Sequence, residues 1–183
     1  MSIGRAIAVV ATLADHGVVR SYAITGAVAA LIYIEPFLTE DLDILVSIDA
    51  FDGRPSGLVL LSPIEAALAD MGYRERLGPS IVVEGWPLQF IPVASTLDEE
   101  ALRDAIDVEI AAAPSVTARV LRAEHLVAKA ISVGRLKDLA RVDTFLDQQK
   151  VDLQALRAVI DRFDLRAAWA TFCMKSGRID PLR

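Results

Sequence analysis

The feature that most constrains this chain is a pair of aspartates in residues 41–48, DLDILVSI, which otherwise have the pattern of a buried β-strand. Residues i and i+2 of a strand point to the same side, so Asp41 and Asp43 share one side. Leu42 and Ile44 then point into the core. Burying two carboxylates costs free energy unless a cation or hydrogen-bond donors compensate them. The pattern therefore indicates either a cation site or the solvated edge of a strand.

A glycine turn precedes the two aspartates. We predict a strand over residues 18–24, then a turn at Gly26, then an alanine-rich helix over residues 27–33. Glycine allows a phosphate to approach the backbone closely, and the first N–H groups of a helix are free to bind it. Paired carboxylates suit Mg²⁺ or Mn²⁺, which bind oxygen ligands and keep substrate phosphates in their shell. The combination predicts phosphoryl chemistry, with Gly26 and the amides of Ala27 and Val28 facing the phosphates.

Local patterns place a mixed α/β part before a helical part. We predict an α+β (mixed α/β) fold, in which a small mixed β-sheet with helices on one side occupies residues 1–121. A helical C-terminal portion follows over residues 122–183. The expected strands cover residues 18–24 and 41–48, with two strands in 80–93 and two in 107–121. The expected helices cover residues 2–16, 27–33, 63–71, 96–105, 123–133, 135–148, 152–163 and 165–176.

Two of these helices begin with a capping-box pattern. Ser62 is followed by Pro63 and by Glu65 three residues later, and Thr96 is followed by Glu99. We therefore expect Ser62 and Thr96 to be the N-cap residues.

Composition limits the partners and the metal ligands. The 183 residues carry a net charge of −6, so we expect no DNA binding, although residues 119–141 form a local basic segment. We find neither a long uncharged apolar run nor a signal-peptide cleavage site, which predicts a cytoplasmic protein without a membrane span. With one cysteine, Cys173, and two histidines, any metal must sit mostly on carboxylates. We expect His16 to cap a helix and His125 to lie at the surface.

The turn and the aspartates together resemble a known signature. TGA at residues 25–27, thirteen further residues and DLD at residues 41–43 are similar to the motif of the nucleotidyltransferase superfamily, which has a polymerase β-like fold. That motif is a glycine followed by serine or glycine, a spacer and two alternating acids. Residues 120–146, VLRAEHLVAKAISVGRLKDLARVDTFL, resemble the segment that follows the core in AbiEii-type toxins and their uncharacterised relatives.

The resemblance implies roles for individual residues. Asp41 and Asp43 would hold the Mg²⁺ or Mn²⁺ ion and take part in catalysis together with Lys129. Taken without the resemblance, Lys129 and its basic neighbours are typical of a solvated helix face on which Asp138 pairs locally. The residues that the resemblance assigns to nucleotide binding are Gly26, Ala27, Thr39, Arg135 and Lys137.

Three positions depart from the pattern. The superfamily usually has a third carboxylate on a later strand, and Gln89 occupies the matching position here. Glutamine cannot carry the negative charge or accept a proton as a carboxylate does. Ala27 replaces the serine or glycine of the turn, and Phe37 stands where toxin-type relatives often have arginine.

The activity that the resemblance implies is Mg²⁺-dependent transfer of a nucleoside monophosphate from an NTP to a hydroxyl acceptor, with release of pyrophosphate. The acceptor is an RNA end, a protein or a small molecule, and the chain would be the toxin of a toxin–antitoxin system with an antitoxin partner. The departures motivate an alternative, a catalytically degenerate relative that binds nucleotide or a protein partner. A third reading is a structural domain with a solvated acidic strand end. The apolar content of 54% leaves room for a homodimer.

Overall fold

The computed structural model describes residues 2–35, 39–48, 61–110 and 115–183. In these residues the chain forms a seven-stranded mixed sheet followed by C-terminal helices. The predicted fold class is confirmed. The strands are β1 (Ser21–Thr25), β2 (Leu42–Ser47), β3 (Arg76–Leu77), β4 (Ser80–Val83), β5 (Trp86–Pro92), β6 (Ile106–Ile110) and β7 (Val116–Val120). The helices are α1 (Ile3–Asp15), α2 (Gly26–Ala30), α3 (Ser62–Asp70), α4 (Thr96–Arg103), α5 (Ala123–Val133), α6 (Leu136–Asp147), α7 (Leu153–Arg162) and α8 (Arg166–Ser176).

The strand that carries Asp43 lies at the centre of the sheet. The strand order is β3-β4-β5-β2-β1-β7-β6. β2 pairs antiparallel with β1 and parallel with β5, and the register places Asp43 beside Thr25 on one side and Gln89 on the other. The sheet therefore brings the predicted turn, the second aspartate and Gln89 side by side on three adjacent strands.

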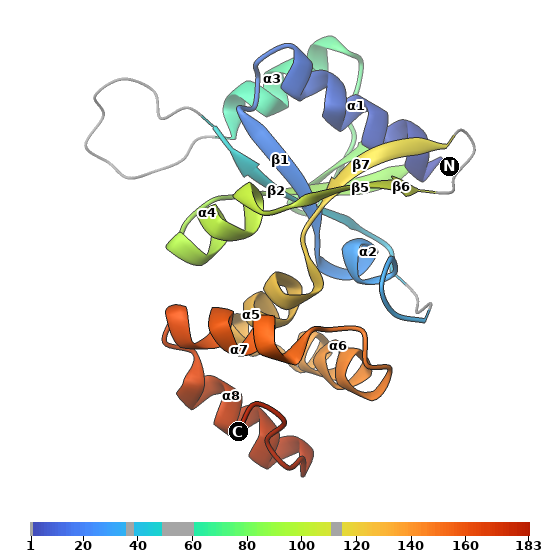
Figure 1. The fold of residues 1–183 in the computed structure, drawn as a ribbon. Coiled ribbons are helices and arrows are strands. Elements are labelled where there is room, and N and C mark those ends of the chain that lie inside the picture. Colours follow the sequence, from blue (N-terminus) through green and yellow to red (C-terminus); the bar gives the residue numbers. More distant parts are fainter. Residues whose placement is uncertain (1, 36–38, 49–60, 111–114) are drawn as a thin grey trace.

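Helices cover both faces of the sheet, whereas the sequence predicted helices on one side. Figure 1 shows α1 and α3 on one face, and α2 and α5 on the other. The reason is visible in β2, where Ile44, Leu45 and Val46 are all fully buried, so both faces of the strand are apolar. A strand with two apolar faces needs cover on both.

Several local predictions hold. Helix α1 is capped by the Ser2 side chain, which accepts a hydrogen bond from the N–H of Arg5. It presents a buried stripe at Ile7, Val10 and Leu13, and Gly17 follows it with a φ of +71°. Apolar residues at this spacing predict a helix over residues 2–16, and a glycine in the left-handed conformation commonly follows the end of a helix.

Two predicted caps are wrong. Helix α3 includes Ser62 in its first turn, and its N-cap is Leu61. The N-cap of α4 is Ser95, whose side chain accepts a hydrogen bond from the N–H of Asp98. Residues 95 and 96 are a serine and a threonine, and either residue type can be an N-cap. The capping pattern therefore does not show which of the two adjacent positions begins the helix.

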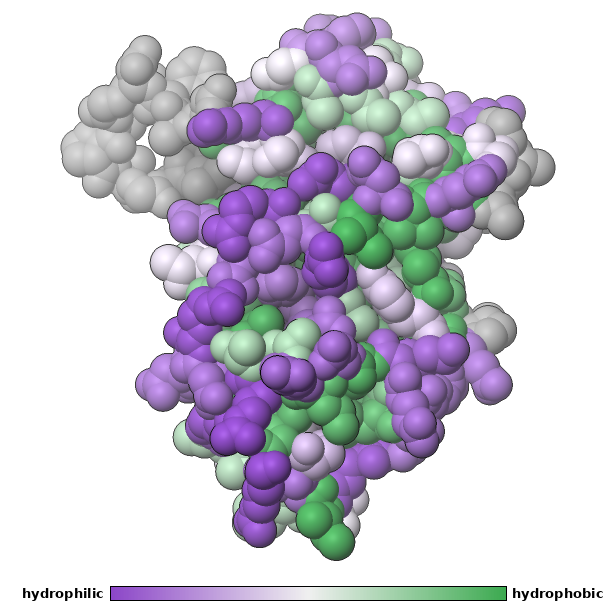
Figure 2. Space-filling view, in the orientation of Figure 1, coloured by the Kyte–Doolittle hydropathy of each residue, from purple (hydrophilic) through white to green (hydrophobic). Residues whose placement is uncertain are grey.

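The C-terminal helices pack beneath the sheet and share its core. One continuous hydrophobic cluster includes Ile44 and Leu88 of the sheet as well as Val127 and Phe145 of the helices. Trp169 is completely buried within the helical part, and Cys173 is buried as well. Figure 2 shows hydrophilic and hydrophobic residues interspersed on the face that it presents, with hydrophobic atoms reaching the surface over the C-terminal helices. The division at residue 121 stays a prediction.

Candidate active site

The turn between β1 and α2 requires glycine. Gly26 has a φ of +64°, a left-handed backbone conformation that other residues adopt at a cost. A Cβ at this position would lie 3.0 Å from Cγ of Asp43 and closer still to its Oδ2. The Asp43 carboxylate therefore rests directly on the backbone of the turn, in space that any side chain at position 26 would fill.

Asp43 is a carboxylate whose charge the protein only partly compensates. Burial raises its pKa, and the nearby carboxylate of Asp41 raises the pKa further, while Lys137, Arg135 and Arg141 act in the opposite direction. Asp41 lies just before β2, and its Oδ1 accepts a hydrogen bond of 3.3 Å from the hydroxyl of Thr39.

This donor set fits Mg²⁺ or Mn²⁺. Asp41 and Asp43 supply oxygen ligands from one side of the strand, and a divalent cation between them would remove the repulsion that raises the pKa of Asp43. Gln89, beside Asp43 in the register, adds a neutral amide in place of a third carboxylate. The residues therefore fit one ion better than two, because a two-metal arrangement needs bridging and outer carboxylates.

Helix α6 supplies positive charge opposite the aspartates. Arg135 donates from Nε to Oδ2 of Asp138 at 2.6 Å, and Arg141 donates to the other oxygen of the same carboxylate. Asp138 is buried, with 6% of its surface exposed, and its two hydrogen bonds hold both guanidinium groups in place. Lys137 faces the same cavity as Asp41 and Asp43.

Lys129, on α5, is held by a different acid. Its ammonium group pairs with Oδ1 of Asp98, near the start of α4. Burial raises the pKa of Asp98, but the hydrogen bonds from Lys129 and from the N–H of Ala94 outweigh burial, and the net pKa is lowered. Lys129 lines a cavity together with Asp43 and Gln89.

Two adjoining cavities surround these groups. The first, called the polar cavity below, has a volume of about 620 Å³. It is lined by Ala27, Thr39, Glu40, Asp41, Asp43, Gln89, Arg135, Lys137, Ala140, Arg141 and Thr144. The second, called the apolar cavity below, has a volume of about 290 Å³. It is lined by Thr25, Gly26, Ala30, Asp43, Gln89, Ile91, Leu126, Val127, Lys129, Ala130, Val133, Arg135, Asp138, Arg141, Val142 and Phe145. Both cavities share Asp43, Gln89, Arg135 and Arg141.

Every residue that the sequence nominated for the site lines one of these cavities. Gly26 and Lys129 line the apolar cavity, and Arg135 lines both cavities. The others line the polar cavity, and they are Ala27, Thr39, Asp41, Asp43 and Lys137, of which Asp43 also lines the apolar cavity. Their roles in binding and catalysis stay predictions. Phe37 lies outside the described residues.

Two residues that the site contains were not nominated for it from the sequence, although local pairing of Asp138 was expected and is confirmed. Asp138 and Arg141 follow Arg135 at intervals of three residues, which places all three on neighbouring positions of one helix face. That spacing was the available signal. The burial of Asp138 between two arginines depends on packing against the sheet and could not be predicted from it.

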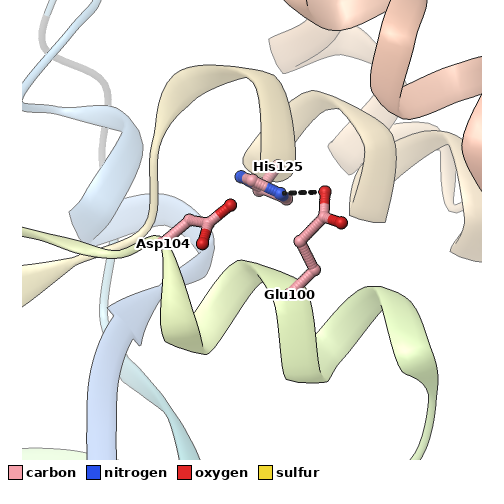
Figure 3. A group of neighbouring side chains, drawn as sticks. All are labelled: Glu100, Asp104 and His125. Carbon is pink, nitrogen blue, oxygen red and sulfur yellow. Dashed lines mark hydrogen bonds and ion pairs between the residues drawn. The ribbon is translucent and has the colours of Figure 1, made fainter.

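A second group of titratable side chains lies elsewhere on the protein. Figure 3 shows Glu100 and Asp104, at the two ends of the last turn of α4, facing His125 of α5. His125 is buried, so its predicted surface position is wrong, and its Nε2 lies 3.2 Å from Oε1 of Glu100. One ligand atom from each of the three residues lies within 4.8 Å of the others. Arginines already neutralise both acids, because Arg162 contacts Glu100 at 2.5 Å and Arg103 contacts Asp104 at 2.8 Å. This arrangement is an ion-pair network that requires no metal.

No protein-family model and no curated protein matches the chain. Its fold matches the crystal structure of an antigenic nucleotidyltransferase-like protein from Paracoccidioides brasiliensis, with a TM-score of 0.53 and 14% identity. The chain has a nucleotidyltransferase-like fold. The match covers 94% of this chain and 93% of that chain, and at this identity it shows the fold alone. The solution structure of the antibiotic-resistance factor ANT(2'')-Ia gives a TM-score of 0.46 at 15% identity, over 91% of this chain and 94% of that one.

In the part of the chain that the structure describes, none of the helices is long and apolar enough to span a membrane.

Proposed function

We propose that this protein transfers a nucleoside monophosphate from a Mg²⁺-bound NTP to a hydroxyl acceptor and releases pyrophosphate. The observation that supports the proposal most strongly is the polar cavity, in which two carboxylates suited to a metal face three cationic side chains of one helical segment. The aspartates are Asp41 and Asp43, and the cations are Arg135, Lys137 and Arg141.

In this proposal Asp41 and Asp43 hold the metal, which would act as a Lewis acid on the phosphoryl oxygens when bound. Lys137 and the two arginines bind the phosphates and stabilise the charge that develops on the leaving group. Asp138 positions the arginines through its two hydrogen bonds. Because α2 has only five residues, the phosphates depend more on these side chains than on a helix dipole.

The step itself is a substitution at phosphorus. The acceptor oxygen forms a bond to the α-phosphorus, and the bond from that phosphorus to the bridging oxygen of the β-phosphate breaks. Gln89 cannot take the acceptor's proton, so the proton passes to solvent water. We therefore expect slow transfer, because general base catalysis typically contributes about 10²- to 10⁴-fold.

The test is pyrophosphate release by the purified protein with Mg²⁺ and each NTP. Release above background that Asp43→Asn abolishes, and that Asp161→Asn on the exposed surface of α7 leaves unchanged, supports the enzyme. Equal release from wild type and Asp43→Asn contradicts it, because the signal would then come from a contaminant.

A second candidate function is nucleotide binding without chemistry. Gln89 is the observation that favours it, since the amide lies beside Asp43 where the superfamily usually places a carboxylate. This candidate predicts Mg²⁺-dependent NTP binding with no pyrophosphate release from any NTP.

The motifs in residues 120–146 support a finer proposal, that the protein is a toxin of the AbiEii type that acts on an RNA or protein acceptor and is neutralised by an antitoxin. Arrest of bacterial growth on expression of wild type but not of Asp43→Asn tests the toxin role. Normal growth with wild type at matched protein levels contradicts it.

A further inference from the structure

The apolar cavity has a lining that the proposed function leaves unused. Its walls are formed mainly by hydrophobic side chains from α2, β5, α5 and α6, and its volume is about 290 Å³. Val133 lines it at the exposed end of α5, with 57% of its surface accessible, so hydrophobic surface continues outward from the cavity. The hydrophobic lining residues are Ala30, Ile91, Leu126, Val127, Ala130, Val133, Val142 and Phe145.

The charged groups of this cavity already have partners inside the protein. Lys129 is paired with Asp98, and Asp138 is paired with Arg135. Asp43 is assigned to the metal. The ammonium groups of a polycationic ligand would therefore find no free carboxylate in this cavity. Burying such a charge without a partner costs on the order of several kcal/mol of binding free energy. The cavity therefore favours an uncharged ligand body.

The position of the cavity assigns it to the acceptor. The attacking and leaving oxygens lie roughly in line across the phosphorus in phosphoryl transfer. Lys137 would bind the leaving end of the triphosphate in the polar cavity, with the α-phosphate at Asp43. The apolar cavity shares Asp43, Gln89, Arg135 and Arg141 with the polar one, and α5 supplies much of its remaining lining. An acceptor in the apolar cavity would therefore meet the α-phosphate at Asp43, where the two cavities adjoin, while the leaving group lies in the polar cavity.

We infer that the apolar cavity binds a small, uncharged and largely apolar molecule whose hydroxyl group is the acceptor, at the same time as the nucleotide occupies the polar cavity. This inference rests on the proposed function. It excludes polycationic hydroxyl compounds as acceptors, because the charged groups of the cavity are already paired. It also excludes large polymers, because a cavity of about 290 Å³ has room for only one end group of a polymer.

The test uses a neutral apolar fluorophore, 1-N-phenylnaphthylamine, and the non-transferable analogue α,β-methylene-ATP with Mg²⁺. Three alanine-to-phenylalanine variants form a matched set. Ala130→Phe fills the apolar cavity, Ala140→Phe narrows the polar cavity, and Ala170→Phe adds the same ring to the exposed surface of α8. The fluorophore should bind wild type with one-site saturation, and Ala130→Phe should weaken its binding about tenfold or more. The other two variants should change it less than about twofold.

The nucleotide analogue distinguishes the possible occupants. Saturation with Mg²⁺-α,β-methylene-ATP should leave the affinity for the fluorophore within about twofold, because the two ligands occupy different cavities. Competitive displacement of the fluorophore would overturn the inference and assign the cavity to the nucleobase. Absence of fluorophore binding to wild type, or equal binding to Ala130→Phe, would overturn it as well.

Failure of the inference and failure of the proposed function give different results. If the analogue binds neither wild type nor Asp41→Asn/Asp43→Asn in calorimetry, the proposed function fails whatever the fluorophore does. With Mg²⁺-ATP, 1-naphthylmethanol should increase pyrophosphate release, and Ala130→Phe should abolish that increase. A larger increase with the polycation kanamycin than with 1-naphthylmethanol would contradict the inference while leaving the proposed function intact.

Discussion

Two groups of acidic side chains in this protein have similar composition and opposite surroundings. Glu100 and Asp104 lie against arginines, and the pKa of each is lowered. Burial acts to raise the pKa of Glu100, but the contacts with Arg162 and His125 outweigh burial. The hydrogen bond from Arg103 lowers the pKa of Asp104. Asp43 lies at the end of a central strand, and its pKa is raised by burial and then by Asp41.

The difference shows how a structural acid is distinguished from a ligand-binding one. Arg162 and Arg103 compensate the two acids of the Glu100–Asp104–His125 group, and these contacts link α4, α5 and α7. The aspartate pair lies beside cavities and keeps charge that a cation would compensate. The proximity of three ligand-type side chains is therefore weaker evidence for a metal than a carboxylate pair whose charge the protein compensates only in part.

Exchange of one acid in each group should separate activity from stability. We expect Asp43→Asn to lower the rate of pyrophosphate release by about 10³-fold or more, because it removes a ligand of the metal. Glu100→Gln should keep the rate within about threefold of wild type. Steady-state measurement of both variants at equal folded concentration checks this. A large loss of rate in Glu100→Gln would place the network in catalysis.

Stability should respond in the reverse order. Glu100 has 7% of its surface exposed, and Glu100→Ala leaves the buried His125 ring without its partner. Because Arg162 is half exposed and can be solvated, we expect a loss of about 2 kcal/mol in the free energy of unfolding, below the usual cost of breaking a buried pair. Urea denaturation measures it. Asp161→Asn, on a surface ion pair, is the matched control and should leave the midpoint unchanged; an equal shift in both would contradict the assignment.

Adding a third carboxylate to the aspartate pair should increase activity, whereas Asp43→Asn should remove it. Gln89→Glu keeps the shape of the side chain and adds a charge beside Asp43. We expect it to raise the rate of pyrophosphate release by about 10- to 100-fold, because the new group binds metal and accepts the acceptor's proton. Rate measurements with Gln89→Ala as control check this. No increase in Gln89→Glu would show that the position does not limit the reaction.

Two glycines with the same backbone conformation allow a smaller test. Gly26 and Gly177 have φ values of +64° and +66°, but only a Cβ at Gly26 meets another group, Asp43. Both alanine variants should lose about 1 kcal/mol from the left-handed backbone. Gly26→Ala should in addition lose Mg²⁺-dependent nucleotide binding, which calorimetry measures. Retention of that binding in Gly26→Ala would show that nucleotide binding does not require the Asp43 carboxylate to lie against the backbone of the turn.

The smallest effect concerns pH. The raised native pKa of Asp43 means that the folded, metal-free protein binds this proton more readily than the unfolded chain does. Its contribution to stability therefore falls as pH rises from about 3.9, the unfolded value, through the native pKa. Asp43→Asn should be more stable than wild type at pH 7 by about 1 kcal/mol or less, and the gap should narrow as pH is lowered through the native pKa. Urea denaturation without Mg²⁺ at several pH values checks this, and a gap that widens toward low pH would contradict it.

Features that depend on neighbouring residues were predictable from the sequence. The helix over residues 2–16 and the two strands within residues 80–93 were predicted because residue periodicity and turn chemistry are local. The motif placed Gly26, Asp41 and Asp43 near one another before the sheet register was known.

Features that depend on distant segments were not predictable. Helices on both faces follow from how β2 is buried, and the burial of His125 follows from the packing of α5 against α4. The burial of Asp138, as opposed to its local pairing, depends on the packing of α6 against α5. Each of these outcomes is set by tertiary contacts that local patterns do not record.

The most direct test of the central claim is calorimetric titration of Mg²⁺-α,β-methylene-ATP into wild type, Asp41→Asn/Asp43→Asn and Glu100→Gln. We predict one-site, Mg²⁺-dependent binding to wild type and to Glu100→Gln, and none to the double variant. Binding of equal strength to the double variant, or no binding to wild type, would contradict the assignment of Asp41 and Asp43 as the metal-nucleotide site.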